Sequence, residues 1–369
     1  MNALPGLRAT VMGLSSDGTI NKKWESAGDG PDQPSELYCD AFSPRIVWPL
    51  VEKLISEERA QSIAERRFLR SLKPGDVAYL WPGSRPWLYE AAGRRGCTVV
   101  AERINTMMTT SRRILSEEYA RLGLESDHGI DERRIADERK SMRQAHFIFS
   151  PSPSVTQSII DAGISADKVI ETSYGLRRED IFEGKSSEGS ERPVTAIFVG
   201  QVSVRKGVHL LLRAWERSHV DARLRIVGKM WHTVEALVKD AVERRDNIEY
   251  LPFVEDLRPV YQNADFFLLP SLEEGSPLVT YLALGAGLPS VVSPMGAGGI
   301  IEHGREGLVV DPHDTDALAD AIRRLATDTE LRRQLGANAR AKARHYTWDK
   351  VAARRGTALL DRVMAPAAS

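Results

Sequence analysis

Two adjacent glutamates follow an apolar stretch of the sequence and precede a predicted helix. Residues 266–269 are apolar and followed by Pro270, as in a buried parallel strand that feeds a loop at its carboxyl end. The loop 273–277 reads EEGSP, and a helix is expected over 278–285. Because a helix N-terminus attracts anions, this loop could hold a phosphate-bearing ligand, with a carboxylate beside it that accepts hydrogen bonds from sugar hydroxyls. The structural alternative is an acidic helix start, which stabilises a helix whatever the function.

A second loop places two cations before a helix. A strand is expected over 194–199, and the following loop, GQVSVRKG, contains Gly200, Arg205 and Lys206 ahead of the helical sequence VHLLLRAW. Cations at a helix N-terminus oppose the helix dipole, so an anion between them is the better explanation of their position. The alternative is a pair of surface cations that merely precedes a helix. We therefore predict a compact anion site at Arg205 and Lys206.

The length and composition predict a globular protein of two domains. The chain has 369 residues, of which 42% are hydrophobic, enough for two cores. A formal net charge of −1 gives no electrostatic footprint for nucleic acid, so we expect no nucleic-acid partner. The two cysteines, Cys39 and Cys97, have no metal or redox spacing, and the sequence shows neither a leader nor a membrane-spanning apolar run. We expect a soluble cytoplasmic protein.

Strands and helices alternate in both halves of the sequence. This alternation predicts an α/β protein with two Rossmann-like domains that face each other across a cleft. A polar stretch rich in Gly and Ser, residues 183–193, separates the halves and is expected to be the linker. The expected strands are 9–14, 77–81, 98–101, 146–150 and 168–172 before the linker, and 194–199, 224–227, 248–253 and 266–269 after it. Amphipathic helical segments are expected at 49–72 and 87–95.

The stretch 112–144 is dense in charges of both signs, which is typical of a solvated helix face. Membrane docking would need a one-sided basic stripe with aromatic residues, and Glu and Asp interrupt each candidate stripe. At most a weak association with a membrane is therefore expected.

No metal site is expected. The triplet Asp314-Thr315-Asp316 stands at a helix start, where Asp314 is predicted to be the N-cap rather than a metal ligand. The eight histidines show no ligand spacing.

The glutamates lie within a longer string that resembles a family signature. PSLEEGSPLVTYLALGAGLPSVVS resembles the donor-site signature PSxxEGFGLVxLEAMAxGxPVV of the retaining GT-B glycosyltransferases of family 4, the glycosyl transferases group 1. The preceding ADFFLLPS and the following EHGREGLVVDP resemble the same family. GQVSVRKG resembles its element G-R-x-x-x-x-K-G, with Lys206 at the position of the lysine. The resemblance is strongest over 194–311.

The resemblance implies a GT-B fold and a hexosyltransferase type of glycosyltransferase. An acceptor domain is then expected at 1–185, a nucleotide-sugar donor domain at 193–345, and a helix that crosses back to the first domain within 346–369. The implied reaction moves a sugar, without a metal, from a UDP- or GDP-sugar to a sugar, lipid-linked or small-molecule acceptor. It retains the anomeric configuration and serves glycan or glycoconjugate biosynthesis. The nucleotide sugar is a substrate, so no cofactor is expected.

The matched positions imply roles for individual residues. Glu274 would bind hydroxyls of the donor sugar and support an oxocarbenium-like transition state, and Arg205 and Lys206 would stabilise charge on the leaving diphosphate. Glu273 is expected to point elsewhere and to tolerate replacement by Gln. The expected donor-binding residues are Gly200, Gly228, Val254, Gly275, Ser276, Pro277, Leu278 and Val279, and the acceptor-side candidates are Gly18, Arg103 and Asn105.

Three positions depart from the family pattern. Leu282 stands where the family has a second glutamate, which usually grips the ribose hydroxyls. Asn105 stands roughly where a histidine often faces the transferred sugar, and Gln201 replaces an arginine whose charge Arg205 could supply. Two alternatives stay open: a non-catalytic partner that binds nucleotide sugar, favoured by Leu282 and Asn105, and a nucleotide-sugar epimerase of the same fold. The sequence does not indicate the base, the sugar or the acceptor.

Overall fold

The computed structural model describes residues 11–13, 38–40, 56–184, 189 and 192–364. These residues form two compact units, one from segments within 1–102, 137–148 and 352–369, and one from segments within 103–136 and 149–351. The candidate Gly18, the start of the predicted helix 49–72 and part of the predicted linker lie outside the described residues. The domain boundaries expected from the sequence stay predictions.

The first half of the chain alternates short strands and helices, as the sequence predicts. The strands are β1 (Val11–Gly13), β2 (Tyr38–Asp40), β3 (Val77–Leu80), β4 (Thr98–Glu102), β5 (Phe147–Ser150) and β6 (Val169–Glu171). The helices are α3 (Glu57–Ser71), α4 (Pro86–Arg94), α5 (Met108–Arg121), α6 (Glu132–Gln144) and α7 (Pro153–Asp161), with short 3₁₀ turns η2 (Ala166–Lys168) and η3 (Arg178–Asp180). β1 pairs in parallel with β2, and a second sheet has the order β3-β4-β5-β6. Ser152 caps α7 by accepting a hydrogen bond from the N–H of Val155.

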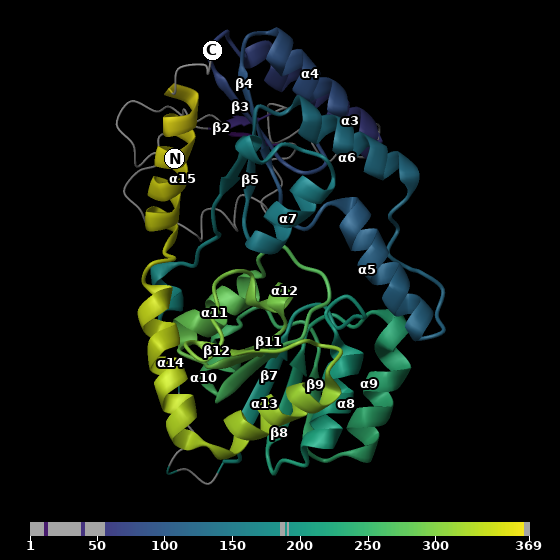
Figure 1. The fold of residues 1–369 in the computed structure, drawn as a ribbon, viewed down its shortest axis with the longest axis vertical. Helices are drawn as coiled ribbons and strands as arrows, with labels where there is room; N and C mark the ends of the chain where they lie inside the picture. Colours follow the sequence, from purple (N-terminus) through teal and green to yellow (C-terminus); the bar gives the residue numbers. More distant parts are fainter. Residues whose placement is uncertain (1–10, 14–37, 41–55, 185–188, 190–191, 365–369) are drawn as a thin grey trace. The chain divides into compact units, whose positions relative to one another are not determined.

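The second half of the chain forms a six-stranded parallel sheet with helices on both faces (Figure 1). The strands are β7 (Thr195–Val199), β8 (Arg223–Val227), β9 (Ile248–Leu251), β10 (Phe266–Leu269), β11 (Ser290–Val292) and β12 (Gly307–Val309). The helices are α8 (Val208–Ser218), α9 (His232–Arg244), α10 (Arg258–Gln262), α11 (Leu278–Ala286), α12 (Pro294–Ala297), α13 (Thr315–Thr327), α14 (Thr329–Ala343) and α15 (Trp348–Met364). None of the described helices has the length and apolar character needed to cross a membrane.

The two central strands, β7 and β10, are buried along their whole length. Such continuous apolar strands are typical of a parallel sheet that is covered on both faces. The helices α8, α9 and α13 pack together, and α10, α11 and α14 form a second group. Because crossovers between parallel strands are right-handed, the two groups lie on opposite faces of the sheet.

The order of the strands, β12-β11-β10-β7-β8-β9, reverses between β7 and β10. Ligands bind outside the carboxyl ends of the strands at such a topological switch point. Two loops leave from there: the cation loop (residues 200–207) after β7, and the glutamate loop (residues 270–277) after β10. The loops contact each other, because the N–H of Leu272 donates to the carbonyl of Arg205 at 2.9 Å.

Gly207→Ala should destabilise the fold more than the same change at a left-handed glycine elsewhere. Gly207 has a φ of 70°, and a Cβ there would lie 2.0 Å from the carbonyl oxygen of Pro270. This variant therefore combines left-handed strain, about 1–2 kcal/mol, with a backbone clash. Gly163, with a φ of 78° and nothing within 4 Å of its missing Cβ, isolates the strain. Urea unfolding should show the larger loss for Gly207→Ala, and equal losses for the two variants would contradict the close contact between the loops.

Candidate active site

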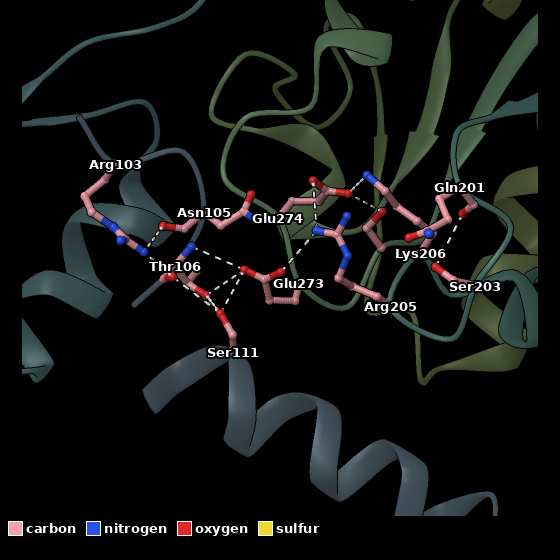
Figure 2. A network of polar contacts seen from close by, with 11 residues as sticks. Arg103, Asn105, Thr106, Ser111, Gln201, Ser203, Arg205, Lys206, Glu273 and Glu274 are labelled. Atoms are coloured by element: carbon pink, nitrogen blue, oxygen red, sulfur yellow. Dashed lines mark hydrogen bonds and ion pairs between the residues drawn. The ribbon is translucent and has the colours of Figure 1, made fainter. Parts of the chain in front are cut away.

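The predicted cations and glutamates lie together where the cation loop meets the glutamate loop (Figure 2). The Nζ of Lys206 forms an ion pair with the Oε1 of Glu274, and the hydroxyl of Ser271 donates to the same oxygen at 3.4 Å. The Nη1 of Arg205 lies 3.3 Å from the Oε2 of Glu273 and 3.9 Å from the Oε2 of Glu274. Two cations and two carboxylates thus form one cluster, in which each cation has a carboxylate partner.

Three of the four side chains of the cluster are buried, Arg205 is partly exposed, and burial perturbs the lysine. Lys206 is 8% exposed, Glu273 2% and Glu274 4%. Burial, followed by the charge of Arg205, lowers the pKa of Lys206 to about 7, while the carboxylate of Glu273 acts in the opposite direction. Buried charges are costly unless they are paired and hydrogen-bonded, so the two carboxylates stabilise both cations in this position.

The helices that follow the two loops begin without side-chain caps. α8 starts after Gly207 and α11 starts after Pro277, and neither residue provides a side-chain hydrogen bond to the first turn. First-turn N–H groups lack partners within a helix, and the helix dipole favours negative charge beside them. Five predicted donor-binding residues lie in the glutamate loop or at the start of α11: Gly275, Ser276, Pro277, Leu278 and Val279.

The other predicted donor-binding residues follow neighbouring strands of the sheet. Gly200 follows β7 and Gly228 follows the adjacent β8, and the N–H of Gly200 donates to the carbonyl of Val227 at 2.9 Å. Val254 follows β9, the edge strand, which is two strands away from β7. Gln201 is half-buried, and the positive charges of the cation loop come after it. The role of these residues in binding a donor stays a prediction.

Glu273 is bonded to a second segment of the chain, which the sequence does not indicate. Its Oε1 accepts hydrogen bonds from the N–H of Thr106 at 3.2 Å, the hydroxyl of Thr106 at 2.8 Å and the hydroxyl of Ser111 at 3.2 Å (Figure 2). All three residues belong to the same compact unit. Glu273 is thus bonded to Thr106, Ser111 and Arg205, whereas Glu274 is the partner of Lys206. The expectation that it tolerates replacement by Gln does not fit this environment, because Thr106, Ser111 and Arg205 together occupy both carboxylate oxygens.

Residues 103–106 form a tight turn beside the cluster, the Arg103 turn. The guanidinium of Arg103 is buried, and its Nη2 donates to the carbonyls of Asn105 at 3.1 Å and Thr106 at 2.8 Å. The hydroxyl of Tyr174 donates to the carbonyl of Arg103 at 3.3 Å. Arg103 therefore shapes the turn, whereas Asn105 is half-buried and its side chain points toward Glu274 in Figure 2. An acceptor-side role for Arg103 and Asn105 stays a prediction.

Gly275 brings the glutamate loop into backbone contact with the Arg103 turn. A Cβ on Gly275 would lie 1.7 Å from the carbonyl oxygen of Ile104, so only glycine permits this approach. A chain of hydrogen bonds adds a second link. The hydroxyls of Ser276 and Tyr281 lie 2.9 Å apart, and the hydroxyl oxygen of Tyr281 accepts from the N–H of Tyr174 at 3.0 Å. The two segments are thus held together at several points.

Glu118, paired with His209, is an exception to the solvated helix face expected over 112–144, where most charged side chains are exposed. The Nε2 of His209, on α8, lies 2.7 Å from the Oε1 of Glu118, on α5, and both side chains are almost fully buried. Burial acts to raise the pKa of Glu118, but the hydrogen bond and charge of His209 outweigh it and hold this pKa below its ordinary value. Leu115 and Tyr119 are buried on the same helix. The charged composition of the stretch hides a packed face of α5.

Leu282 and Asp314 both occupy structural positions. Leu282 is half-buried and packs against the hydrophobic core, so this position of α11 supplies no carboxylate. Asp314 caps α13 by accepting from the N–H of Ala317 at 2.9 Å, as predicted. Within the part of the chain that the structure describes, no three His, Cys, Asp or Glu side chains are placed to hold a metal ion. Metal independence stays a prediction.

Fold and site together define a doubly wound α/β domain with a cation cluster at its switch point. Residues 193–328 match the family model described as Glycosyl transferases group 1. The match includes the stretch 194–311, over which the sequence resemblance to this family is strongest.

Curated relatives match this chain over about two fifths of their own length. The D-inositol 3-phosphate glycosyltransferase of Pseudarthrobacter chlorophenolicus is 33% identical over 169 residues, which cover 42% of this chain and 40% of that protein. The O-antigen chain mannosyltransferase B of Escherichia coli is 30% identical over 162 residues, which cover 42% of each chain.

Solved structures cover more of the chain and share its fold. Anabaena HepE, in complex with UDP and glucose, has a TM-score of 0.67 at 15% identity and covers 95% of this chain and 91% of its own. Sucrose-phosphate synthase from Thermosynechococcus elongatus has a TM-score of 0.66 at 20% identity and covers 85% of this chain and 81% of its own. The predicted α/β GT-B fold is confirmed.

Proposed function

We propose that the protein is a retaining glycosyltransferase of the cytoplasm. It transfers a sugar from a UDP- or GDP-sugar to a sugar, lipid-linked or small-molecule acceptor in glycan or glycoconjugate biosynthesis. The proposal rests on the family of residues 193–328 and on one observation: Arg205 and Lys206 lie in a buried cluster at the switch point, just before α8. The HepE structure with UDP and glucose, which shares the fold, supports a nucleotide-sugar donor.

A diphosphate can replace the carboxylates as the partner of the two cations. Lys206 is paired with Glu274, and Arg205 lies nearest to Glu273. A diphosphate carries more charge and more acceptor oxygens than one carboxylate, so it would take over Lys206. Glu274 is then free to turn toward the donor sugar.

The proposed step breaks the bond between the anomeric carbon of the donor and the diphosphate oxygen. The acceptor hydroxyl oxygen bonds to the anomeric carbon, its proton passes to the departing diphosphate, and negative charge grows on the phosphate oxygens. Arg205, Lys206 and the first-turn N–H groups of α11 would stabilise this charge without a metal ion. Glu274 would bind the sugar hydroxyls and support the oxocarbenium-like transition state.

A non-catalytic nucleotide-sugar binder is the second candidate. Leu282 offers no carboxylate to a ribose, and Asn105 has no group that transfers protons at neutral pH. Such a protein would bind the nucleotide sugar but would neither transfer nor hydrolyse its sugar. The release of nucleoside diphosphate from a bound nucleotide sugar therefore separates the two candidates.

A thermal-shift panel tests the proposal directly. UDP, GDP, ADP and their sugar derivatives are added to the full chain with and without EDTA. One nucleotide series should raise the unfolding temperature, because binding to the folded state stabilises it by mass action. EDTA should change nothing. The proposal fails if no nucleotide stabilises the protein, and an effect that depends on a divalent ion would contradict metal independence.

Lys206→Ala should weaken binding of the preferred nucleoside diphosphate while leaving the free nucleoside nearly unaffected. A hydrogen bond to a charged group contributes about 1.5–3 kcal/mol, so the expected loss is roughly 10- to 100-fold. Lys239→Ala is the matched control, because Lys239 is an exposed lysine of α9 paired with Glu235. Calorimetric titration measures both ligands, and equal losses for nucleoside and diphosphate would contradict the assignment.

The affinity for nucleoside diphosphate should fall as the pH rises from about 7.5 to 9, where the phosphates are already ionised. The pKa of Lys206 is about 7, so much of this lysine is neutral in that range, whereas a bound diphosphate favours the ammonium form. Binding must then take up a proton, and the affinity decreases by up to about tenfold per pH unit. Calorimetry in buffers of different ionisation enthalpy measures the uptake. Lys206→Arg should abolish it, and proton uptake that persists in this variant would exclude Lys206 as its source.

Glu274→Gln should lower turnover much more than donor affinity. The change keeps the shape and one acceptor oxygen but removes the charge that supports the transition state. Turnover should fall roughly 10²-fold, which corresponds to about 2.7 kcal/mol. The release of nucleoside diphosphate from the donor is measured beside Glu235→Gln, an exposed carboxylate of α9. Normal turnover in Glu274→Gln would show that this carboxylate does not act on the sugar.

A further inference from the structure

We infer that Glu273 is a positioning residue, which holds Arg205 with one carboxylate oxygen and the Arg103 turn with the other. The inference rests on the proposed function, in which Arg205 binds phosphate and Asn105 lies beside Glu274. Glu273 would fix the positions of both. The family signature leaves the position of Glu273 open, as an x in PSxxEG. The assignment therefore comes from the contacts of this side chain.

Four donors fix the carboxylate of Glu273. Its Oε1 accepts from the N–H and the hydroxyl of Thr106 and from the hydroxyl of Ser111, at 3.2, 2.8 and 3.2 Å. Its Oε2 faces the Nη1 of Arg205 at 3.3 Å. A carboxylate has about four acceptor sites, and here three donors lie at Oε1 and one at Oε2. Since the residue is 2% exposed, water hardly competes for it.

Glu274 is held less firmly than Glu273. It is paired with Lys206, accepts from Ser271 at 3.4 Å, and lies 3.9 Å from Arg205. A diphosphate that takes over Lys206 releases Glu274, but it does not compete for the donors of the Arg103 turn. Glu273 therefore keeps its place while Arg205 turns toward the phosphates. Glu274 thus exchanges its partner, while Glu273 limits the positions that the guanidinium of Arg205 can take.

A second observation shows that the Arg103 turn is seated against the glutamate loop. At Gly275 the two backbones are so close that a Cβ would lie 1.7 Å from the carbonyl oxygen of Ile104. The bonds from Thr106 to Glu273 fix the chain just after Asn105, and the Ile104 contact fixes it just before. Asn105 is thereby held with its side chain toward Glu274 (Figure 2).

Glu273→Gln separates the two contacts. A glutamine keeps one oxygen for Thr106 and Ser111, and its amide NH₂ then faces the guanidinium of Arg205, donor against donor. Because a negative charge beside the cations is removed, nucleoside diphosphate should bind at least as tightly as in the wild type. Turnover should fall roughly tenfold or more, because Arg205 is no longer confined. A merely structural residue would not give this split between affinity and turnover.

Glu273→Ala removes both contacts. Turnover should again fall, and the amide N–H of Thr106 loses its acceptor. Amide hydrogen exchange over residues 104–111 should then become faster, by roughly tenfold or more, without any nucleotide present. Glu273→Gln should keep exchange near the wild-type rate, because its oxygen still accepts from Thr106.

The test measures three quantities for the wild type, Glu273→Gln, Glu273→Ala and the surface control Glu235→Gln. They are UDP and GDP affinity, diphosphate release from UDP-glucose or from the nucleotide sugar selected by thermal shift, and amide exchange over 104–111. Should a Glu273 variant fail to fold, Thr106→Val with Ser111→Ala replaces it. This variant leaves Glu273 in place, removes two of its donors, and should lower turnover and speed exchange.

Lower turnover with undiminished diphosphate affinity in Glu273→Gln, together with faster exchange in Glu273→Ala, supports the inference. Wild-type turnover in Glu273→Gln overturns the role toward Arg205, and wild-type exchange in Glu273→Ala overturns the role toward the Arg103 turn. If the wild type binds neither UDP nor GDP, the proposed function fails and the Arg205 half of the inference fails with it. The exchange rates still decide the other half.

Discussion

The pairing of the buried Lys206 and the partly exposed Arg205 with two buried carboxylates is the interaction on which the rest of the site depends. Glu274 and Glu273 stabilise Lys206 and Arg205 at the switch point of the sheet, above all the buried Lys206, because an unpaired buried charge is costly. The pairs require the two loops to approach closely, and the left-handed Gly207 makes that approach feasible. The reversal of strand order therefore sets the position of the site, and the charge pairs hold the cation loop and the glutamate loop together there.

Glu273 and Glu274 are adjacent in sequence but differ in how firmly their side chains are held. Glu273 is tied to α5 and to the Arg103 turn, whereas Glu274 is tied mainly to one lysine whose pKa is already lowered. In the proposed function Glu274 exchanges its partner, while Glu273, locked by its hydrogen bonds, supports the positions of its neighbours. Leu282, on α11, makes an apolar contact with the core at the position where the family has a carboxylate. This position therefore offers no carboxylate to a ribose.

Local sequence signals and the family resemblance predicted the fold and the place of Arg205 and Lys206 before a helix, and they failed for contacts between distant segments. The strand β10, the start of α11 and the cap Asp314 follow from residues within one turn of each other, so pattern and propensity identify them. Thr106 and Glu273 are 167 residues apart, and Glu118 and His209 are 91 residues apart. No periodicity or spacing connects such pairs, and a charge-rich stretch conceals the buried Glu118.

While Lys206 is protonated, Arg205 and Lys206 are matched in number by Glu273 and Glu274, so the cluster in that state is electrically neutral. A neutral cluster generates little long-range field and offers phosphate-bearing molecules little electrostatic steering. Association rates that vary only weakly with ionic strength would be the kinetic sign of this. Ligands would then be distinguished by their direct contacts with the site. These contacts must offset the loss of the ion pair between Lys206 and Glu274. Inorganic phosphate has neither a base nor a sugar to contribute, so at a site of the proposed kind it is expected to compete weakly with a nucleotide sugar.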